Sequence, residues 1–223
     1  MTGVRPSRPT RPEVVEDLGL ADTRAVLAWR FPEPRMALSS APVGGGSAGL
    51  DWLVNVGVTE GYARTDLAGH ADEVAARLGL VGTGAALLTA ADVRRAVDAE
   101  DGDVVVDATV GVTKPTWAAD ADDAFAVRDG DGWVPGTINV VVQLPVALSP
   151  AAAVNAVVTA TEAKAQALFE AGIPGTGTAS DAVVVLWPAL VPAEPFAGPR
   201  SPWGARIARA VHAAVRHGLE VHP

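Results

Sequence analysis

The sequence predicts an α+β fold in which a mixed, largely antiparallel sheet is layered with about three main helices. Apolar runs of strand length, each bounded by Pro or Gly, occur along most of the chain, and three longer segments show helical spacing. Strands dominate the early part, and helix, strand and helix follow one another late. Of the 223 residues, 49% are hydrophobic and 19% are charged, which is enough apolar material for a full core.

The first twenty residues differ in composition from the rest. The segment MTGVRPSRPTRP is basic and rich in proline, and it lacks the apolar stretch of a signal peptide. We therefore expect a flexible leader over residues 1–20, a single domain over residues 21–223, and a cytoplasmic protein.

The early strands are predicted from apolar runs and their breaks. A first strand covers Arg24 to Phe31, and the Pro32-Glu33-Pro34 turn ends it. A second strand, Arg35 to Ala41, is expected to pair back on the first as a hairpin. A glycine-rich loop follows, and a third strand covers Asp51 to Val58.

The middle of the chain alternates between helical and extended patterns. We predict a helix from Asp66 to Leu78, a short buried strand from Ala85 to Thr89, one or two helical turns from Asp92 to Asp98, a loop from Glu100 to Asp103 and a strand from Val104 to Val112. Residues 118–132 are acidic and are expected to form a solvated loop or hairpin arm, with a metal-binding run as the alternative.

The last third carries the strongest signals. A strand from Gly136 to Leu144 precedes the longest helix, which starts at Ser149 or Pro150 and ends at Glu170. Ser149 is a typical N-cap, and Gly172 stops the helix. A strand from Ala182 to Trp187 and a helix from Trp203 to His217 complete the chain.

Composition excludes several function classes. The formal net charge of −9 disfavours nucleic-acid binding, and the absence of cysteine excludes disulfides, thiol nucleophiles and iron–sulfur clusters. No apolar run is long enough to span a membrane. The four histidines lack metal-site spacing, so we expect no metal and no cofactor. The sequence leaves a homo-oligomer open.

Two segments place polar groups beside glycines. Ser39 and Ser40 precede the triple glycine that contains Gly44 and Gly45, whose backbone N–H groups are suited to hold an anion or oxyanion. The segment GTGTASDA, from Gly175 to Ala182, brings Thr and Ser hydroxyls and one Asp to a strand entrance. The alternatives are a flexible loop for the first segment and an ordinary helix-to-strand connection for the second.

The long helix carries a polar stripe. Asn155, Thr159, Glu162 and Gln166 share one face at 100° per residue. This composition suits the lining of a polar site, and a solvent-exposed stripe is the alternative. On the preceding strand, Asn139 and Gln143 alternate with valines and are expected to face the same cleft as Asn155.

Several of these segments together resemble the adenosylcobinamide amidohydrolase (CbiZ) family. The resemblance is carried by MALSSAPVGGG, DWLVNVGV, GTINVVV, NAVVTATEAKAQAL, GTGTASDA and WGARIARAVHAAV, which cover most of the chain from about residue 35 onward. It implies a small-molecule corrinoid substrate. The implied reaction hydrolyses the amide between a corrin propionyl arm and aminopropanol, which gives adenosylcobyric acid.

The resemblance supplies no catalytic residues, so roles follow from what amide hydrolysis needs. Glu162 is our candidate general base or acid, near Asp181, with Thr178 or Ser180 as nucleophile or substrate contact. Backbone N–H groups of residues 44–46 or 175–177 are candidates for the oxyanion site. The candidate substrate contacts are Ser39, Ser40, Asn139, Asn155, Thr159, Thr176 and Trp203.

Three alternatives stay open. In the first, the protein binds a corrinoid without hydrolysing it, and in the second, it hydrolyses another amide. In the third, a Gly–Thr junction cleaves itself and frees a threonine amine as its own base; the junctions are Gly136-Thr137, Gly175-Thr176 and Gly177-Thr178.

Overall fold

The computed structural model describes residues 8–121 and 136–221 and confirms an α+β fold. Over this part of the chain, eight strands form one sheet: β1 (Glu13–Glu16), β2 (Thr23–Ser39), β3 (Gly46–Val58), β4 (Gly84–Thr89), β5 (Val97–Asp101), β6 (Val104–Val110), β7 (Ile138–Gln143) and β8 (Ala182–Pro188). The α-helices are α1 (Leu67–Arg77), α2 (Pro150–Glu170) and α3 (Pro202–Val221), and a short 3₁₀ helix, η1, covers Val93–Arg95.

The sheet is mixed and mostly antiparallel, as predicted. Its strand order is β4-β3-β2-β8-β7-β6-β5, and β1 pairs with β2 outside this path. The pairs β3–β4 and β7–β8 are parallel, and the other neighbours are antiparallel.

The predicted hairpin between Arg24–Phe31 and Arg35–Ala41 is wrong, because one long strand, β2, replaces it. Its register with β3 shifts between Arg30 and Arg35, so the residues Pro32 to Pro34 are left out of the ladder. Proline lacks the backbone N–H that a strand ladder needs. Pro32 and Pro34 lie at an irregularity of the strand, where no ladder hydrogen bond is required. The actual hairpin turn is the glycine-rich segment between Ser39 and Gly46, which joins β2 to β3.

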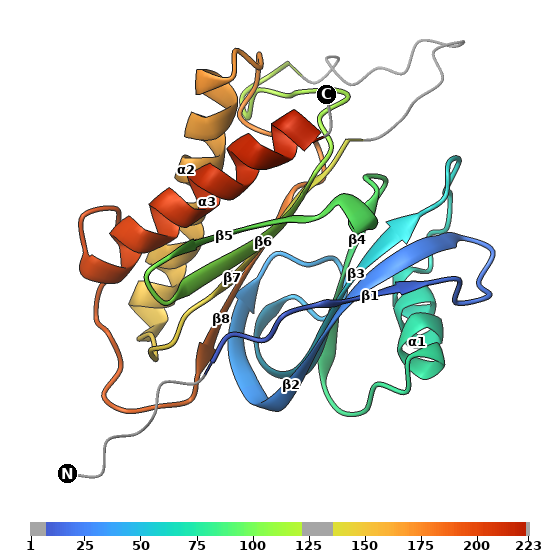
Figure 1. Ribbon diagram of the computed structural model, residues 1–223, viewed down its shortest axis with the longest axis horizontal. Helices are drawn as coiled ribbons and strands as arrows, with labels where there is room; N and C mark the ends of the chain where they lie inside the picture. Colours follow the sequence, from blue (N-terminus) through green and yellow to red (C-terminus); the bar gives the residue numbers. More distant parts are fainter. Residues whose placement is uncertain (1–7, 122–135, 222–223) are drawn as a thin grey trace.

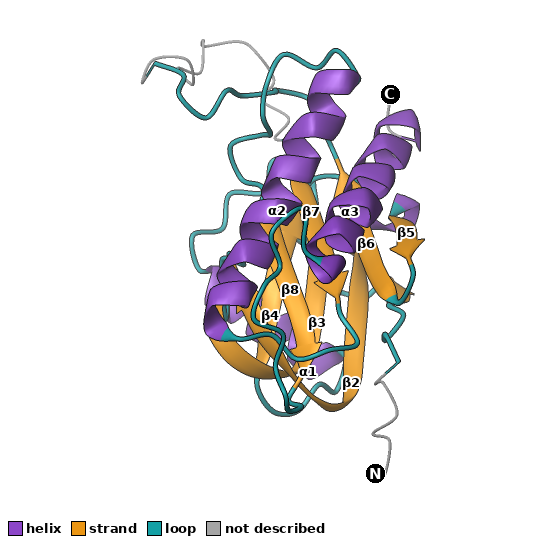
Figure 2. Cartoon of the chain, turned by 90° about the vertical axis from the view of Figure 1, so that its left-hand side faces the viewer, coloured by secondary structure: helices purple, strands orange, loops and turns teal. Residues whose placement is uncertain are grey.

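The irregular strand β2 divides the sheet into two halves that pack face to face. The far part of β2 pairs with β8, and the segments on both sides of the irregularity pair with β3. One core cluster fills the space between the halves and includes Leu27 and Leu53 from one half and Val184 from the other. Helices α2 and α3 cover the outer face of β5–β8, and α1 covers the outer face of β2–β4 (Figures 1 and 2). The layers are therefore helix, sheet, sheet, helix.

The helices follow local rules. Ser149 caps α2 by accepting a hydrogen bond from the Ala152 N–H, and Pro150 occupies the first turn. Gly172 has a φ of 75°, which ends α2 where the sequence predicted. Asp66 caps α1 in the same way through the Gly69 N–H.

Three elements differ from the expectation. Strand β1, Glu13–Glu16, lies within the segment expected to be a flexible leader and pairs with β2. The predicted helical turns from Asp92 to Asp98 shrink to η1, and β5 begins at Val97 and includes part of the expected loop. Of the acidic segment, residues 122–132 lie outside the described residues.

The space between the half-sheets holds buried polar side chains. Asp107 on β6 is 5% exposed, and its Oδ2 accepts hydrogen bonds from Trp29 Nε1 (3.3 Å) and Gln143 Nε2 (3.4 Å). Burial raises the pKa of the Asp107 carboxyl from 3.8 to about 6, against the smaller opposing effects of these hydrogen bonds and of Arg11. The ionised form of Asp107 therefore costs the folded state free energy.

We expect Asp107→Asn to stabilise the fold at neutral pH. The folded protein holds the Asp107 proton more tightly than the unfolded chain, so this carboxyl costs stability progressively as the pH rises from about 4 to about 6. Above pH 6 the full cost is roughly 3 kcal/mol. In urea denaturation at pH 4 and pH 7.5, the free energy of unfolding of the variant should exceed that of the wild type only at the higher pH. Asp103→Asn, at an exposed side chain that does not contribute to the Asp107 pKa, is the control, and a pH-independent difference for Asp107→Asn would contradict the assignment.

Candidate functional site

A pocket of about 680 Å³ lies where the ends of several strands meet. The end of β4 contributes Leu88 and Thr89, the start of β7 contributes Thr137 and Asn139, and the residues next to β8 contribute Ser180 and Asp181. The remaining lining residues are Arg24, Ser40, Pro42, Val58, Thr59, Glu60, Gly61, Tyr62, Leu67, Ala90 and Ala182. The volume suits a small-molecule ligand.

Asn139 is the most deeply buried polar group of this pocket, at 1% exposure. Its Nδ2 donates to Asn55 Oδ1 (3.0 Å) and to the Leu88 carbonyl (3.1 Å), and Asn55 in turn donates to Thr109 Oγ1 (3.0 Å). The Oδ1 of Asn139 has no hydrogen-bond partner among the described residues. An unpaired buried acceptor costs ~1–3 kcal/mol, and a ligand N–H or O–H would relieve it.

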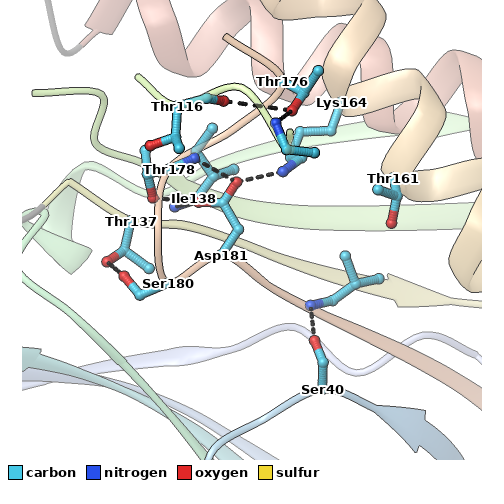
Figure 3. A network of polar contacts seen from close by, with 12 residues as sticks. Ser40, Thr116, Thr137, Ile138, Thr161, Lys164, Thr176, Thr178, Ser180 and Asp181 are labelled. Carbon is cyan, nitrogen blue, oxygen red and sulfur yellow. Dashed lines mark hydrogen bonds and ion pairs between the residues drawn. The ribbon is translucent and has the colours of Figure 1, made fainter. Parts of the chain in front are cut away.

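Three of the hydroxyl side chains that line the pocket, those of Ser40, Thr137 and Ser180, come from distant parts of the chain. Thr137 Oγ1 and Ser180 Oγ lie 2.8 Å apart and share a hydrogen bond (Figure 3). Ser40 Oγ accepts a hydrogen bond from the Val183 N–H at 3.0 Å. The Ser40 hydroxyl hydrogen is therefore directed to another acceptor, such as a ligand oxygen.

Asp181 ties the site together. Its Oδ1 accepts from Thr178 Oγ1 (2.6 Å) and the Ile138 N–H (2.9 Å), and its Oδ2 accepts from the Thr178 N–H (3.0 Å) and from Lys164 Nζ (Figure 3). The Asp181 and Lys164 side chains are only 10% and 7% exposed. A carboxylate has about four acceptor positions, so these donors occupy the capacity of Asp181. The geometry therefore favours a structural clamp over a general base.

A second hydrogen-bonded chain reaches the pocket from α1. Tyr62 Oη lies 2.8 Å from His70 Nδ1, and His70 Nε2 lies 2.8 Å from Thr23 Oγ1. Burial lowers the pKa of His70 below its usual value, and burial raises the pKa of the Tyr62 hydroxyl. A neutral imidazole with one N–H therefore orients Tyr62 at the pocket wall.

Four of the residues that the sequence indicated come together in this pocket: Ser40, Asn139, Ser180 and Asp181. Thr178 stands behind them, bound to Asp181. Glu162 and Asn155 are exposed on α2 and do not line the pocket. The expected pairing of Glu162 with Asp181 is not found. Two residues further along α2, Lys164 turns inward and takes that place.

Other predicted contacts have structural partners outside the pocket lining. Thr159 donates to the Ala197 carbonyl (2.9 Å), and Thr176 accepts from the Ala118 N–H (3.2 Å). Ser39 Oγ accepts from the Ala41 N–H (2.9 Å), and the Trp203 ring lies 4.7 Å from the Arg206 guanidinium carbon.

Gly44 and Gly45 serve the hairpin turn and do not line the pocket. A Cβ at Gly44 would lie 2.3 Å from the Gly84 carbonyl oxygen, and a Cβ at Gly45 would lie 2.3 Å from the Ala41 carbonyl oxygen. These glycines are therefore needed for close packing of backbone on backbone.

Sequence reasoning missed several polar residues of the site, among them Asn55, Tyr62 and Thr89. Asn55 and Thr89 are polar residues within apolar runs of their strands, so the sequence pattern did not set them apart. Tyr62 lies in the connection between β3 and α1, which contains no recognisable motif. Thr137 was indicated only as one of three Gly–Thr junctions that could cleave themselves, and not as a pocket residue.

Neither a metal centre nor a membrane-spanning helix is found in the described part of the chain. Over residues 8–121 and 136–221, no three His, Asp or Glu side chains gather as metal ligands would. Within the same ranges, no helix has both the length and the hydrophobicity for crossing a bilayer.

Comparison with known proteins identifies the family. The model of the CbiZ family, adenosylcobinamide amidohydrolase, matches residues 8–222. The chain belongs to this family. A relative from Halobacterium salinarum, named adenosylcobinamide amidohydrolase, is 38% identical over 135 residues, which are 60% of this chain and 58% of that protein. One of the same name from Methanosarcina mazei is 36% identical over 95 residues, 39% of this chain and 48% of that protein. The chain thus matches about half the length of these relatives.

Two solved structures match this chain at low similarity. A protein from Pyrococcus horikoshii OT3 has a TM-score of 0.47 and 12% identity, covering 97% of this chain and 82% of its own. The L-aminopeptidase D-Ala-esterase/amidase from Ochrobactrum anthropi has a TM-score of 0.41 and 13% identity, covering 96% and 83%. Neither similarity adds to the family assignment.

We expect Lys164→Ala to destabilise the fold strongly. It leaves the Asp181 carboxylate buried without its cation, a change that typically lowers the free energy of unfolding by ~3–5 kcal/mol. Glu162→Ala, on the exposed side of the same helix, is the matched control and should stay within about 0.5 kcal/mol of the wild type. Urea denaturation of both variants checks this, and equal stabilities would show that the Asp181 clamp contributes little.

Proposed function

We propose that this protein is an amidohydrolase that acts on adenosylcobinamide. Water is added across the amide that joins a propionyl arm of the corrin ring to aminopropanol, which gives adenosylcobyric acid and 1-amino-2-propanol. The observation that carries the proposal is the match to the CbiZ family model over residues 8–222, together with the names of the two relatives.

The pocket chemistry supports an amide substrate. The unpaired Oδ1 of Asn139 is an acceptor for an amide N–H or for the hydroxyl of aminopropanol. The Ser40 hydroxyl is a donor for a carbonyl oxygen. An amide group offers both an N–H and a carbonyl oxygen, so it has the kind of partner that each of the two positions can take. The volume of about 680 Å³ admits a side arm together with part of a larger ring system.

The hydroxyl pair supports nucleophilic attack. Amide hydrolysis needs a nucleophile, a donor for the developing oxyanion and a proton for the departing amine. Thr137 and Ser180 place two hydroxyl groups 2.8 Å apart in the pocket, either of which can attack the carbonyl carbon or hold an attacking water. Asp181 positions both hydroxyl groups. It accepts a hydrogen bond from the N–H of Ile138, the residue after Thr137, and it directly follows Ser180 in the chain.

Glu162 has no part in the proposed mechanism, because it is exposed and does not line the pocket. Asp181 is assigned a positioning role in place of proton transfer. The lining residues extend along the chain from Arg24 to Ala182, which agrees with the proposal that residues 21–223 form one catalytic domain.

The direct experiment incubates the purified protein with adenosylcobinamide. We expect release of 1-amino-2-propanol and formation of adenosylcobyric acid in equal amounts. Binding without amine release would indicate a corrinoid-binding protein. Hydrolysis of simple amides without hydrolysis of adenosylcobinamide would overturn the corrinoid assignment.

We expect Ser40→Ala to lower kcat by about tenfold, and Ser39→Ala to leave it nearly unchanged. Each serine accepts one backbone N–H, so the two variants lose similar structural contacts. Only Ser40 lines the pocket, where its hydroxyl is worth ~1.4 kcal/mol if it hydrogen-bonds the reacting carbonyl. Steady-state amine release measures the difference, and equal effects of the two variants would remove Ser40 from the mechanism.

A further inference from the structure

The chain has four Gly–Thr junctions, and their surroundings differ. Thr83, which follows Gly82, is exposed and does not line the pocket. Thr176 contacts the backbone at Thr116 and Ala118, and Thr178 is bound to Asp181; neither lines the pocket. Thr137 does line the pocket, at 4% exposure and 2.8 Å from Ser180 Oγ. The fold therefore singles out the Gly136–Thr137 junction.

Among the described residues, no titratable side chain of the pocket lining hydrogen-bonds to the hydroxyl pair of Thr137 and Ser180. The titratable residues of the lining are Arg24, Glu60, Tyr62 and Asp181. Asp181 is saturated with four donors, and Arg24 is always a cation. Glu60 is exposed, and burial raises the pKa of Tyr62, which disfavours the tyrosinate. A hydroxyl nucleophile in this pocket therefore needs a base from another source.

We propose that the chain cleaves its own peptide bond between Gly136 and Thr137, and that the freed Thr137 is both the nucleophile and the carrier of its base. The assignment of Thr137 as nucleophile rests on the proposed function. The cleavage itself is a chemical event that is testable without any substrate.

The backbone around this bond is held firmly on its downstream side. The Ile138 N–H donates to Asp181 Oδ1 (2.9 Å), and the Thr137 carbonyl accepts from the Gly111 N–H (3.0 Å). Position 136 admits no side chain, because a Cβ there would lie 2.6 Å from the Gly111 carbonyl oxygen and 2.7 Å from the Thr113 nitrogen. The carbonyl carbon of Gly136 consequently has no Cβ beside it to hinder attack.

The cleavage has two steps. Thr137 Oγ1 attacks the carbonyl carbon of Gly136 through a five-membered ring; a C–O ester bond forms, the C–N peptide bond breaks, and the hydroxyl proton ends on the Thr137 nitrogen. Water then hydrolyses the ester, which leaves Gly136 with a carboxylate and Thr137 with a free hydroxyl and a free amine. Ser180 Oγ, in hydrogen-bond contact with Thr137 Oγ1, keeps the attacking oxygen in place.

The freed amine then serves turnover. An α-amine has an ordinary pKa of about 8, which suits proton transfer near neutral pH. It takes the proton from Thr137 Oγ1 as that oxygen attacks the substrate carbonyl, and it gives the proton to the departing amine nitrogen. Water releases the acyl group by the same route in reverse.

Both pieces stay together in the folded protein. Strand β6 belongs to the first piece and β7 to the second, and the two strands pair antiparallel from Val105–Gln143 to Val110–Ile138. Both pieces also contribute to the core between the half-sheets. The two pieces are therefore expected to remain associated under native conditions, so cleavage has to be measured on the denatured protein.

The test is the intact mass of the purified, folded protein after denaturation. We expect two species, residues 1–136 and residues 137–223, in place of one species near 22.7 kDa, with Thr137-Ile138-Asn139 at the new N-terminus. Thr137→Ala should stay at full length and release no amine, Thr137→Ser should cleave, and Thr176→Ala should cleave like the wild type.

Each other outcome overturns the proposal. A single full-length species in the folded wild type does so, whether or not it is active. A new N-terminus at Thr176 or Thr178 would also overturn it. Cleavage of Thr137→Ala would show that a contaminating protease, and not Thr137, cuts the chain. The two proposals fail separately: amine release by a full-length chain removes self-cleavage alone, and self-cleavage without amine release removes the substrate alone.

Discussion

The Asp181 carboxylate is the contact on which the geometry of the site depends. It joins three elements that are far apart in the sequence: Lys164 on α2, the start of β7 through the Ile138 N–H, and the Gly–Thr segment through Thr178. Because the pair with Lys164 is almost fully buried, neither charge is tolerated without the other. This coupling holds Ser180 beside Thr137, and hence sets the distance between the hydroxyl groups of these two residues.

The second constraint is the irregularity in β2, which lets one sheet pack against itself. The facing halves bury Leu27, Leu53 and Val184 between them, yet their inner faces also carry Asn55, Asp107 and Asn139. A buried polar group has to be paired, and most of these groups are paired across the two halves. The exception is the Oδ1 of Asn139, a residue that also lines the pocket. A ligand at this position would complete the hydrogen bonding of the core.

Much of the fold was predictable because its signals are local. The N-cap at Ser149, the stop at Gly172 and the valine-rich strands depend on neighbours in sequence, and these elements lie where expected. The candidate site was predictable only in part. Ser40, Asn139, Ser180 and Asp181 were found as polar residues in unusual places, whereas the polar stripe on α2 misled. Its Glu162 faces solvent, and the side of that helix that contacts Asp181 is marked by Lys164, a residue type that seldom lies buried.

The sequence by itself determined the class of fold, the limits of the long helices and the family, because periodicity, capping and motif order are properties of contiguous residues. The tertiary structure decided which polar residues share one cavity. Hydrogen bonds such as Thr137–Ser180 and Asn139–Asn55 join residues 43 and 84 positions apart, and no local pattern encodes such separations. The tertiary structure also decided the role of Asp181, because the number of hydrogen-bond donors that the fold brings to a carboxylate determines whether its oxygens remain available to accept a proton.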